Sequence, residues 1–166
     1  RKNISENYAG AIDNYLGLIN IKKSKFLDNN AKKHAGVIFN GGMIECLEDS
    51  IFKNNYSLLK GGAIYTTKSS STNISKSVFD SNNAYGNGGL GGAIFNNSFN
   101  NGNEDFWLDI INCNFINNYA NDDGAAIFNK GHLNIQKSYF ESNINQSYGD
   151  ILKNEGENVE VSIKNT

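Results

Sequence analysis

The chain has 166 residues, a net charge of -2 and a pI of about 5.7, so it has the size of one domain and lacks the basic excess that favours nucleic acid or an anionic membrane. No apolar run approaches the roughly 20 residues of a membrane-spanning helix, so we expect no membrane insertion by this segment. Asparagine occurs 30 times and proline is absent. We attribute the asparagines both to the compositional bias of an AT-rich genome and to amide ladders between stacked strands.

Two short motifs recur along the chain in a fixed order. The first is Gly-Gly-Ala-Ile, strict at 61–64 and 91–94 and looser around Ile12, Ile38 and Ile127. The second is Phe-x-x-Asn, with five copies: Phe26 with Asn29, Phe52 with Asn55, Phe79 with Asn82, Phe115 with Asn118, and Phe140 with Asn143. From each Phe to the next Ile or Leu the spacing is 12 residues four times and 15 once, whereas from Ile to Phe it ranges from 13 to 21. A unit that is constant in one half and variable in the other is typical of a solenoid with loops.

The short apolar segments between these motifs read as strands. They alternate apolar and polar residues over three to five positions, as at 133–135 and 161–163, and Gly and Asn interrupt every helical period. We predict three short strands per repeat of about 25 residues, which make one coil of a parallel β-helix. Residues 1–166 then form a single all-β module of about six coils.

Stacked coils place equivalent residues in files along the axis. We expect the isoleucines that end the first motif and the five phenylalanines to face the interior, and the five motif asparagines, from Asn29 to Asn143, to form a ladder at bends. Cys113 takes the place that serine holds two residues before the other phenylalanines, so Cys113 and Cys46 should be free thiols. Gly62 and Gly92 suit a corner without space for a side chain.

One repeat departs from the pattern. The segment 41–47 places Glu45 where other repeats have an apolar residue or Thr72. A local bulge that turns Ile44 and Cys46 inward instead would resolve this conflict.

The paired motifs resemble the repeat of chlamydial polymorphic membrane proteins, which also marks adhesin-like surface proteins of methanogenic archaea and some AT-rich bacteria. The resemblance extends from Gly10 to Asn154. It implies a right-handed, single-stranded, pectate-lyase-like parallel β-helix, an extracellular or cell-surface location, and a role in adhesion or surface coating. It brings no shared catalytic residues, and we expect neither a cofactor nor a metal.

Two insertions, 84–90 and 97–107, are the candidate sites for a ligand. The second contains the only Trp and two Phe beside two acids, a composition that suits a glycan because rings cover the apolar face of a sugar and polar groups bind its hydroxyls. The candidate ligand-binding residues are Phe99, Glu104, Asp105, Phe106, Trp107 and Tyr85. The competing interpretation is that these aromatic side chains fold back and cover the coil beneath them.

Asn73, in an Asn-x-Ser sequence, is expected to face outward and is a candidate for glycosylation. Asn55 and Asn96 also precede such a pattern, but they belong to inward files and should stay unmodified.

These observations favour an extracellular adhesin-like or structural module, part of a longer surface protein. Its expected partners are host or neighbouring-cell glycans or proteins, flanking coils and like subunits stacked end to end. The main alternative is a fragment of a polysaccharide hydrolase or lyase, because Asp122 and Asp123 are adjacent acids. No His or Arg accompanies this pair, so we expect a solvated turn and no enzyme. A self-stacking filament subunit is the second alternative, because neither end of the sequence shows an amphipathic cap.

Overall fold

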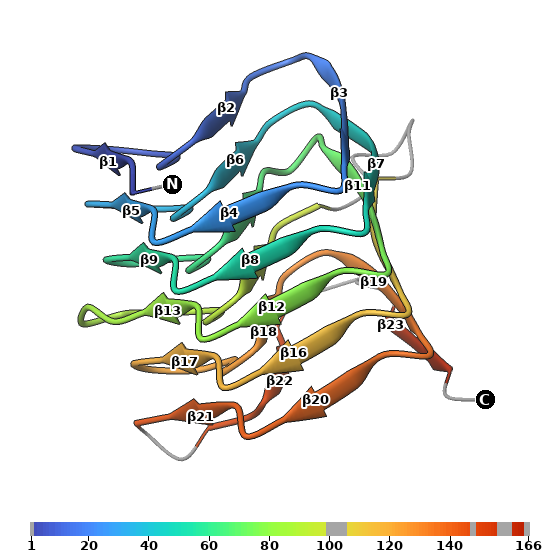
Figure 1. Cartoon of the computed structure of the whole chain (residues 1–166). Coiled ribbons are helices and arrows are strands. Elements are labelled where there is room, and N and C mark those ends of the chain that lie inside the picture. The colour runs from blue at the N-terminus through green and yellow to red at the C-terminus, as the bar shows by residue number, and fades with distance from the viewer. Residues whose placement is uncertain (1, 99–105, 147–148, 156–160, 165–166) are drawn as a thin grey trace.

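The computed structural model describes residues 2–98, 106–146, 149–155 and 161–164, and in these ranges it contains strands and no helix. No helix in this part of the chain is therefore available to cross a membrane. The chain winds in successive coils that lie one above another (Figure 1), and the strand pairs between neighbouring coils are parallel. About six coils are stacked, which confirms the predicted β-solenoid.

The strands of successive coils form four parallel sheets, three of six strands and one of five. The arm sheet, at the left of Figure 1, consists of β1 (Ile4–Ser5), β5 (Asn30–Ala31), β9 (Tyr56–Ser57), β13 (Asn83–Ala84), β17 (Tyr119–Ala120) and β21 (Ile144–Asn145). The Ile sheet consists of β2 (Ile12–Asn14), β6 (Ile38–Asn40), β10 (Ile64–Thr66), β14 (Ile94–Asn96), β18 (Ile127–Asn129) and β22 (Leu152–Asn154). The long sheet consists of β3 (Leu18–Lys22), β7 (Met43–Glu48), β11 (Ser71–Ser75), β15 (Trp107–Ile111), β19 (His132–Gln136) and β23 (Val161–Lys164). The Phe sheet consists of β4 (Lys25–Leu27), β8 (Ile51–Lys53), β12 (Val78–Asp80), β16 (Asn114–Ile116) and β20 (Tyr139–Glu141).

The presence of four sheets corrects the prediction of three strands per coil. The additional sheet is the arm sheet, whose strands have two residues each. A two-residue strand shows no alternation of apolar and polar positions, so its sequence cannot be told from that of a turn. These strands account for part of the constant spacing between Phe and Ile.

The motif phenylalanines form one continuous interior file. The ring centroids of Phe26 and Phe52, of Phe52 and Phe79, and of Phe79 and Phe115 lie 4.8 Å apart, and those of Phe115 and Phe140 lie 4.9 Å apart. The three central rings are fully buried, while Phe26 and Phe140 at the two ends of the file are half-buried. The rings pack against the isoleucine file and against the file of Leu47, Ile74 and Ile110. Like side chains therefore lie on like in the core, as the repeat predicts.

The Phe-x-x-Asn motif forms a corner. The residue before each Asn has a left-handed backbone, with φ of 58° at Asp28, 53° at Asn54 and 56° at Ser81. This turn brings the Asn side chain inside. The Nδ2 of Asn82 donates to the Oδ1 of Asn118 on the next coil at 3.0 Å and to the carbonyl oxygen of Phe52 on the preceding coil at 2.9 Å. The amide ladder thereby satisfies backbone groups that a corner would otherwise leave unpaired.

Asn29 keeps the pattern of the ladder near its N-terminal end. It is buried at its corner as predicted, and its Nδ2 donates to the Oδ1 of Asn55 at 2.9 Å. On the preceding coil the Nδ2 of Asn3 donates to the Asn29 Oδ1 at 2.9 Å, as the Nδ2 of Asn82 does to the Asn118 Oδ1. Asn3 lies 26 residues before Asn29, the interval that also separates Asn29 from Asn55, so the ladder includes one asparagine more than the five that the sequence assigned to it.

A second left-handed corner lies between the long sheet and the Phe sheet, with serine in place of asparagine. The Ser50 Oγ accepts the backbone N–H of Ser24 at 3.1 Å and donates to the Glu48 carbonyl oxygen at 2.9 Å. Cys113 takes this position on the fourth coil, where it is fully buried and free. Burial raises the pKa of its thiol to about 11.

The Gly-Gly pair of the first motif is explained by the backbone. Gly61 and Gly91 have φ of 65° and 69°, which a residue with a Cβ adopts only at a cost. The second glycine lies against the next coil, because a Cβ added to Gly62 would come within 2.0 Å of the Gly92 carbonyl oxygen. The crowding comes from neighbouring backbone.

The long sheet contains the expected bulge. The register between β7 and β11 shifts between Thr72 and Ile74, and Ile44 is fully buried. Cys46, however, is not inward as predicted: it pairs in register with Asn20 and is half-buried, and Leu47 takes the inward position instead. The extra residue of the bulge thus resets the alternation one position later than the sequence indicates.

Candidate ligand-binding surface

The structure separates the predicted ligand-binding residues. Phe99, Glu104 and Asp105 lie outside the described residues. Trp107 is the first residue of β15, so the strand begins inside the segment that the sequence assigned to a loop. Trp107 takes the β register because Leu108 and Ile110, the next inward positions, are fully buried in the core.

Trp107 points outward from the long sheet and is half-buried. Its indole stacks on the imidazole of His132, which pairs with it in register one coil later, with ring centroids 5.0 Å apart and planes 26° from parallel. One coil earlier the corresponding position is Ser71, since Thr72 pairs with Leu108. The aromatic stack is therefore limited to Trp107 and His132 on this side, because the preceding coil has the small side chain of Ser71 at the same position.

A polar network lies beside the indole on the same face. The Nδ2 of Asn134 donates to the Oδ1 of Asp109 at 2.8 Å, and the Nε2 of Gln136 donates to the Oδ1 of Asn134 at 3.4 Å. Trp107 and these three residues, with Ser162 and Lys164 of β23, line a hollow of about 390 Å³. One aromatic side chain, amide and carboxylate groups and a lysine thus converge on one shallow site, which we call the Trp107 hollow.

Phe106 lines a different hollow, of about 350 Å³, with Leu16 and Met43 of the first two coils and with glycine and serine residues at 41, 42, 69 and 71. Apolar side chains are exposed at this end of the long sheet, and the exposed fraction reaches 79% at Tyr15 and 78% at Leu16.

Tyr85 belongs to another face of the molecule. It follows β13 of the arm sheet, which lies on the opposite side of the coils from the long sheet (Figure 1), and its ring meets Tyr56 edge-on with centroids 6.4 Å apart. The structure therefore does not bring Tyr85 and Trp107 together.

Asn73 lies on β11 with its side chain on the outer face, where the Nδ2 donates to the Glu45 carbonyl oxygen at 3.2 Å. Asn55 and Asn96 are fully buried.

Asp122 and Asp123 have structural partners in the turn before β18. The Oδ1 of Asp123 accepts the backbone N–H groups of Gly124 at 2.8 Å and Asp150 at 2.9 Å, and its Oδ2 lies 3.3 Å from the Nζ of Lys153. The Oδ1 of Asp122 accepts the Nδ2 of Asn121. In the described ranges, no group of three or more His, Cys, Asp or Glu side chains is placed to hold a metal ion.

Sequence reasoning missed a second aromatic file, outside the core. The residues that follow the motif isoleucines stack along the outer face of the Ile sheet, with ring centroids 4.9 Å apart for Phe39 and Tyr65, 5.0 Å for Tyr65 and Phe95, and 5.4 Å for Phe95 and Phe128. The signal was available, because an aromatic residue follows the motif isoleucine in four consecutive repeats.

The segments that connect the strands of the arm sheet to the Ile sheet, which we call the arm, cover this outer aromatic file. His34 lies between the rings of Tyr8 and Tyr65, at 5.6 and 5.3 Å, and the Nζ of Lys60 lies 4.7 Å from the ring centroid of Phe95. Burial, reinforced by Lys60 and Lys33, lowers the pKa of His34 to about 4. The file therefore acts as a satellite core that holds the arm against the Ile sheet.

Comparison with known protein families gives a match for two segments of the chain. Residues 49–67 and 112–130 match the repeat of the Chlamydia polymorphic membrane proteins. These two segments are polymorphic-membrane-protein repeats. Each covers a Phe-x-x-Asn corner and runs to the end of the next Ile-sheet strand, through β8, β9 and β10 in the first case and β16, β17 and β18 in the second. No curated protein and no solved structure matches the chain significantly.

The repeat of this family therefore corresponds to most of a coil, without the long sheet. The residues that define it, such as Phe52, Asn55 and Ile64, are buried. The surface of the long sheet lies outside both matched segments.

Proposed function

We propose that this chain is a β-helical module of a cell-surface protein and that it binds a carbohydrate in the Trp107 hollow. The observation that carries the proposal is the placement of one indole beside a hydrogen-bonded series of carboxylate and amides on a face that the repeat does not define. The repeat supports the surface location, because it is named for membrane proteins. Its own defining residues are used for stacking the coils.

The composition of the hollow suits a sugar better than an apolar ligand. An aromatic side chain covers the C–H face of a pyranose, while Asp109 accepts hydrogen bonds from hydroxyls and Gln136 or Lys164 donates to sugar oxygens. All these residues belong to neighbouring strands of one sheet. The site is therefore largely preformed, which lowers the entropic cost of binding.

The test is binding on a glycan array, followed by calorimetry with the best ligand. Trp107→Ala should weaken binding at least tenfold, and Asp109→Asn should weaken it by a smaller factor. Tyr139→Ala is the matched control, because Tyr139 is an exposed aromatic residue on the Phe sheet. Equal binding by Trp107→Ala and the parent chain would exclude this site. Release of oligosaccharide products from uronate polymers would instead favour the enzyme alternative.

Asn73 is the proposed glycosylation site of the same face, because its amide lies outside and is not part of a buried ladder. A glycan there would stand on the strand next to β15. Mass spectrometry of the natural protein, compared with Asn73→Gln, tests this, and an unmodified Asn73 would remove the proposal.

A further inference from the structure

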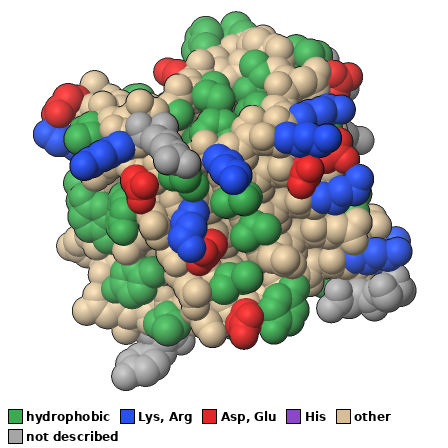
Figure 2. Space-filling model, viewed as in Figure 1, with side chains coloured by type: hydrophobic (Ala, Val, Ile, Leu, Met, Phe, Trp, Pro, Cys, Tyr) green, Lys and Arg blue, Asp and Glu red, His purple; other side chains and the backbone are tan. Residues whose placement is uncertain are grey.

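Charged side chains collect at the corner where the long sheet turns into the Phe sheet. Lys22, Lys23 and Lys25 flank this corner on the first coil, and Lys76 occupies it on the third. In the space-filling view, blue and red side chains lie close together along the right-hand edge, where β3, β7 and β11 end (Figure 2). We call the surface formed by these four lysines and the acids of the second coil the basic corner.

The acids of the second coil do not neutralise the basic corner. Glu48 contacts two lysines, since its carboxylate oxygens lie 2.8 Å from the Nζ of Lys76 and 3.8 Å from the Nζ of Lys22. Neither Lys23 nor Lys25 has a salt bridge within the described ranges. With Asp49 as the second acid, four positive groups face two negative ones.

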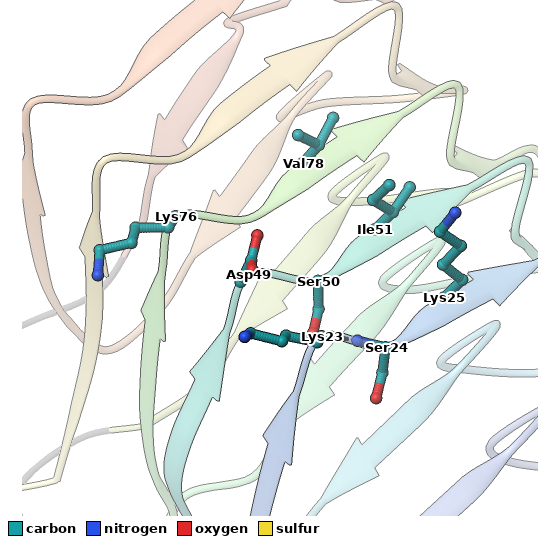
Figure 3. Close-up of a pocket in the computed structure, with 8 residues that line it drawn as sticks. All are labelled: Lys23, Ser24, Lys25, Asp49, Ser50, Ile51, Lys76 and Val78. Carbon is teal, nitrogen blue, oxygen red and sulfur yellow. Dashed lines mark hydrogen bonds between the residues drawn. The ribbon is translucent and has the colours of Figure 1, made fainter.

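The basic corner is hollowed. Lys23, Lys25, Asp49 and Lys76 line a depression of about 330 Å³, together with Ser24, Ser50, Ile51 and Val78. In Figure 3 the side chains of Lys23 and Lys76 extend to one side with Asp49 near them, whereas Lys25 lies on the other side, beside Ile51. Lys23 and Lys76 occupy the same corner position two coils apart, which is about 10 Å at the usual strand spacing.

The distribution of charge along the whole chain supports a distinct role for this end. Residues 1–80 contain 11 Lys and Arg and 7 Asp and Glu, whereas residues 81–166 contain 4 and 10. The first part of the chain therefore carries a formal charge of +4 and the second part -6. An anionic ligand is attracted to the first coils and repelled by the later ones.

We propose that the basic corner binds an acidic polysaccharide, with sulfate or carboxylate groups at the lysines and sugar hydroxyls at Asp49. The lysine positions follow the axis of the solenoid, so they suit a linear polymer that lies along it. Two features disfavour other polyanions. The depression lacks an aromatic side chain on which a base could stack. Asp49 and Glu48 interrupt the lysines, which disfavours an anionic lipid surface but supplies acceptors for hydroxyl groups.

This site is separate from the Trp107 hollow, and the two can be tested independently. Binding of heparin fragments, polygalacturonate and neutral dextran is measured by calorimetry at low and physiological salt. The parent chain should bind a charged polymer with an affinity that falls as salt screens the lysines, whereas salt should not change its binding of neutral dextran. Lys23→Gln/Lys25→Gln should weaken this binding at least tenfold, and Asp49→Asn should preserve or strengthen binding of the sulfated fragments.

The matched control is Lys32→Gln/Lys33→Gln, which removes the same charge from the turn after β5. This control should change heparin or polygalacturonate binding by less than about twofold. Equal losses from the two double variants would show that only net charge matters, and failure of the parent chain to bind either charged polymer at low salt would overturn the proposal. Circular dichroism confirms that each variant is folded, which the exposed lysines lead us to expect.

Discussion

The Oδ1 atom of Asn118 accepts two hydrogen bonds from Asn82 on the preceding coil, one from its backbone N–H and one from its Nδ2, both at 3.0 Å. The Nδ2 of Asn118 donates to the Oδ1 of Asn143 and to the Phe79 carbonyl oxygen, each at 2.9 Å. One side chain thus links three coils and is completely buried. The same set of contacts recurs at Asn55 and Asn82, so the ladder is part of the mechanism by which coils stack.

Replacement of Asn118 should therefore be costly. Asn118→Ala removes the acceptor of the Asn82 N–H, and the Asn82 amide, the Phe79 carbonyl and the Asn143 Oδ1 each lose one hydrogen bond. We expect a loss of about 2–4 kcal/mol in the free energy of unfolding. The measurement is urea unfolding followed by circular dichroism. Asn114→Ala, an exposed position of the same coil, is the control and should stay within about 0.5 kcal/mol of the parent chain. Similar losses in the two variants would show that the ladder is not a special contributor.

Gly62 tests the close approach of neighbouring coils. Gly62→Ala would place a Cβ 2.0 Å from the Gly92 carbonyl oxygen and 2.5 Å from the Asn83 nitrogen. Because two backbones must separate, we expect a loss of at least about 3 kcal/mol, or no folded protein. Gly88→Ala, where no atom lies within 4 Å of the new Cβ, should lose only about 1 kcal/mol from its positive φ. A tolerated Gly62→Ala would mean that the coils are more widely spaced than described.

The two thiols should react at different rates. Cys113 is fully buried and burial raises its pKa to about 11, so almost no thiolate is present near neutral pH. We expect a thiol reagent to modify the half-buried Cys46 in the folded chain and to reach Cys113 only after denaturation. Labelling of Cys46→Ser and Cys113→Ser, with and without urea, distinguishes the two. Rapid labelling of Cys113 in folded Cys46→Ser would contradict its assignment to the buried serine file.

The satellite core should make stability depend on pH. The pKa of His34 is lowered to about 4 in the folded chain, below the ordinary value of 6.5, so the unfolded chain takes up this proton first as the pH falls. The contribution of neutral His34 to the free energy of unfolding is therefore complete above pH 6.5 and decreases as the pH falls towards 4. Because the side chain is partly exposed, we expect a change of about 1–2 kcal/mol from this group.

Unfolding of the parent chain and of His34→Phe at several pH values measures this contribution. The variant keeps an aromatic ring between Tyr8 and Tyr65 and should lose less stability between pH 6.5 and 4. A directly measured His34 pKa near 6.5, by NMR titration, would show that the arm does not bury the imidazole.

The fold could be predicted from the sequence because its signal is repeated. The central Phe-x-x-Asn copies, such as Phe79 and Asn82, each contact the equivalent residues of the next coil, so the repeat of the motif predicts that the coils stack. The contact of Asn29 with Asn3 was missed, although Asn3 lies 26 residues before Asn29, the interval that separates Asn29 from Asn55. The arm strands were also missed, since two residues such as those of β13 show no period.

The position of the bulge was a further limit on the prediction of the fold. The alternation of apolar and polar residues indicates that one residue of the segment 41–47 is extra, but it does not fix where the backbone accommodates it. The register of β7 against both neighbouring strands places Leu47 inward and Cys46 outward. That choice depends on the strands of the adjacent coils.

The candidate site could be predicted only in part. Trp107 was identified by composition, but the residues beside it were not. Asp109 lies on the same strand, whereas Asn134 lies 25 residues further along the chain, on the next coil with Gln136, and only the strand register brings them together. Tyr85 was grouped with Trp107 because both lie in or next to insertions. The sequence does not show that the two insertions leave different sheets.

The most direct test of the stacked interior is the unfolding free energy of Phe79→Ala. Phe79 is fully buried between Phe52 and Phe115, with ring centroids 4.8 Å away on both sides. Urea unfolding should show a loss of about 3–5 kcal/mol, the usual cost of removing a buried aromatic ring, while Tyr85→Ala, an exposed ring that follows β13 on the same coil, should lose well under 1 kcal/mol. A loss below about 1 kcal/mol for Phe79→Ala would contradict the ordered column of like side chains on which the fold, the ladders and the placement of both proposed sites depend.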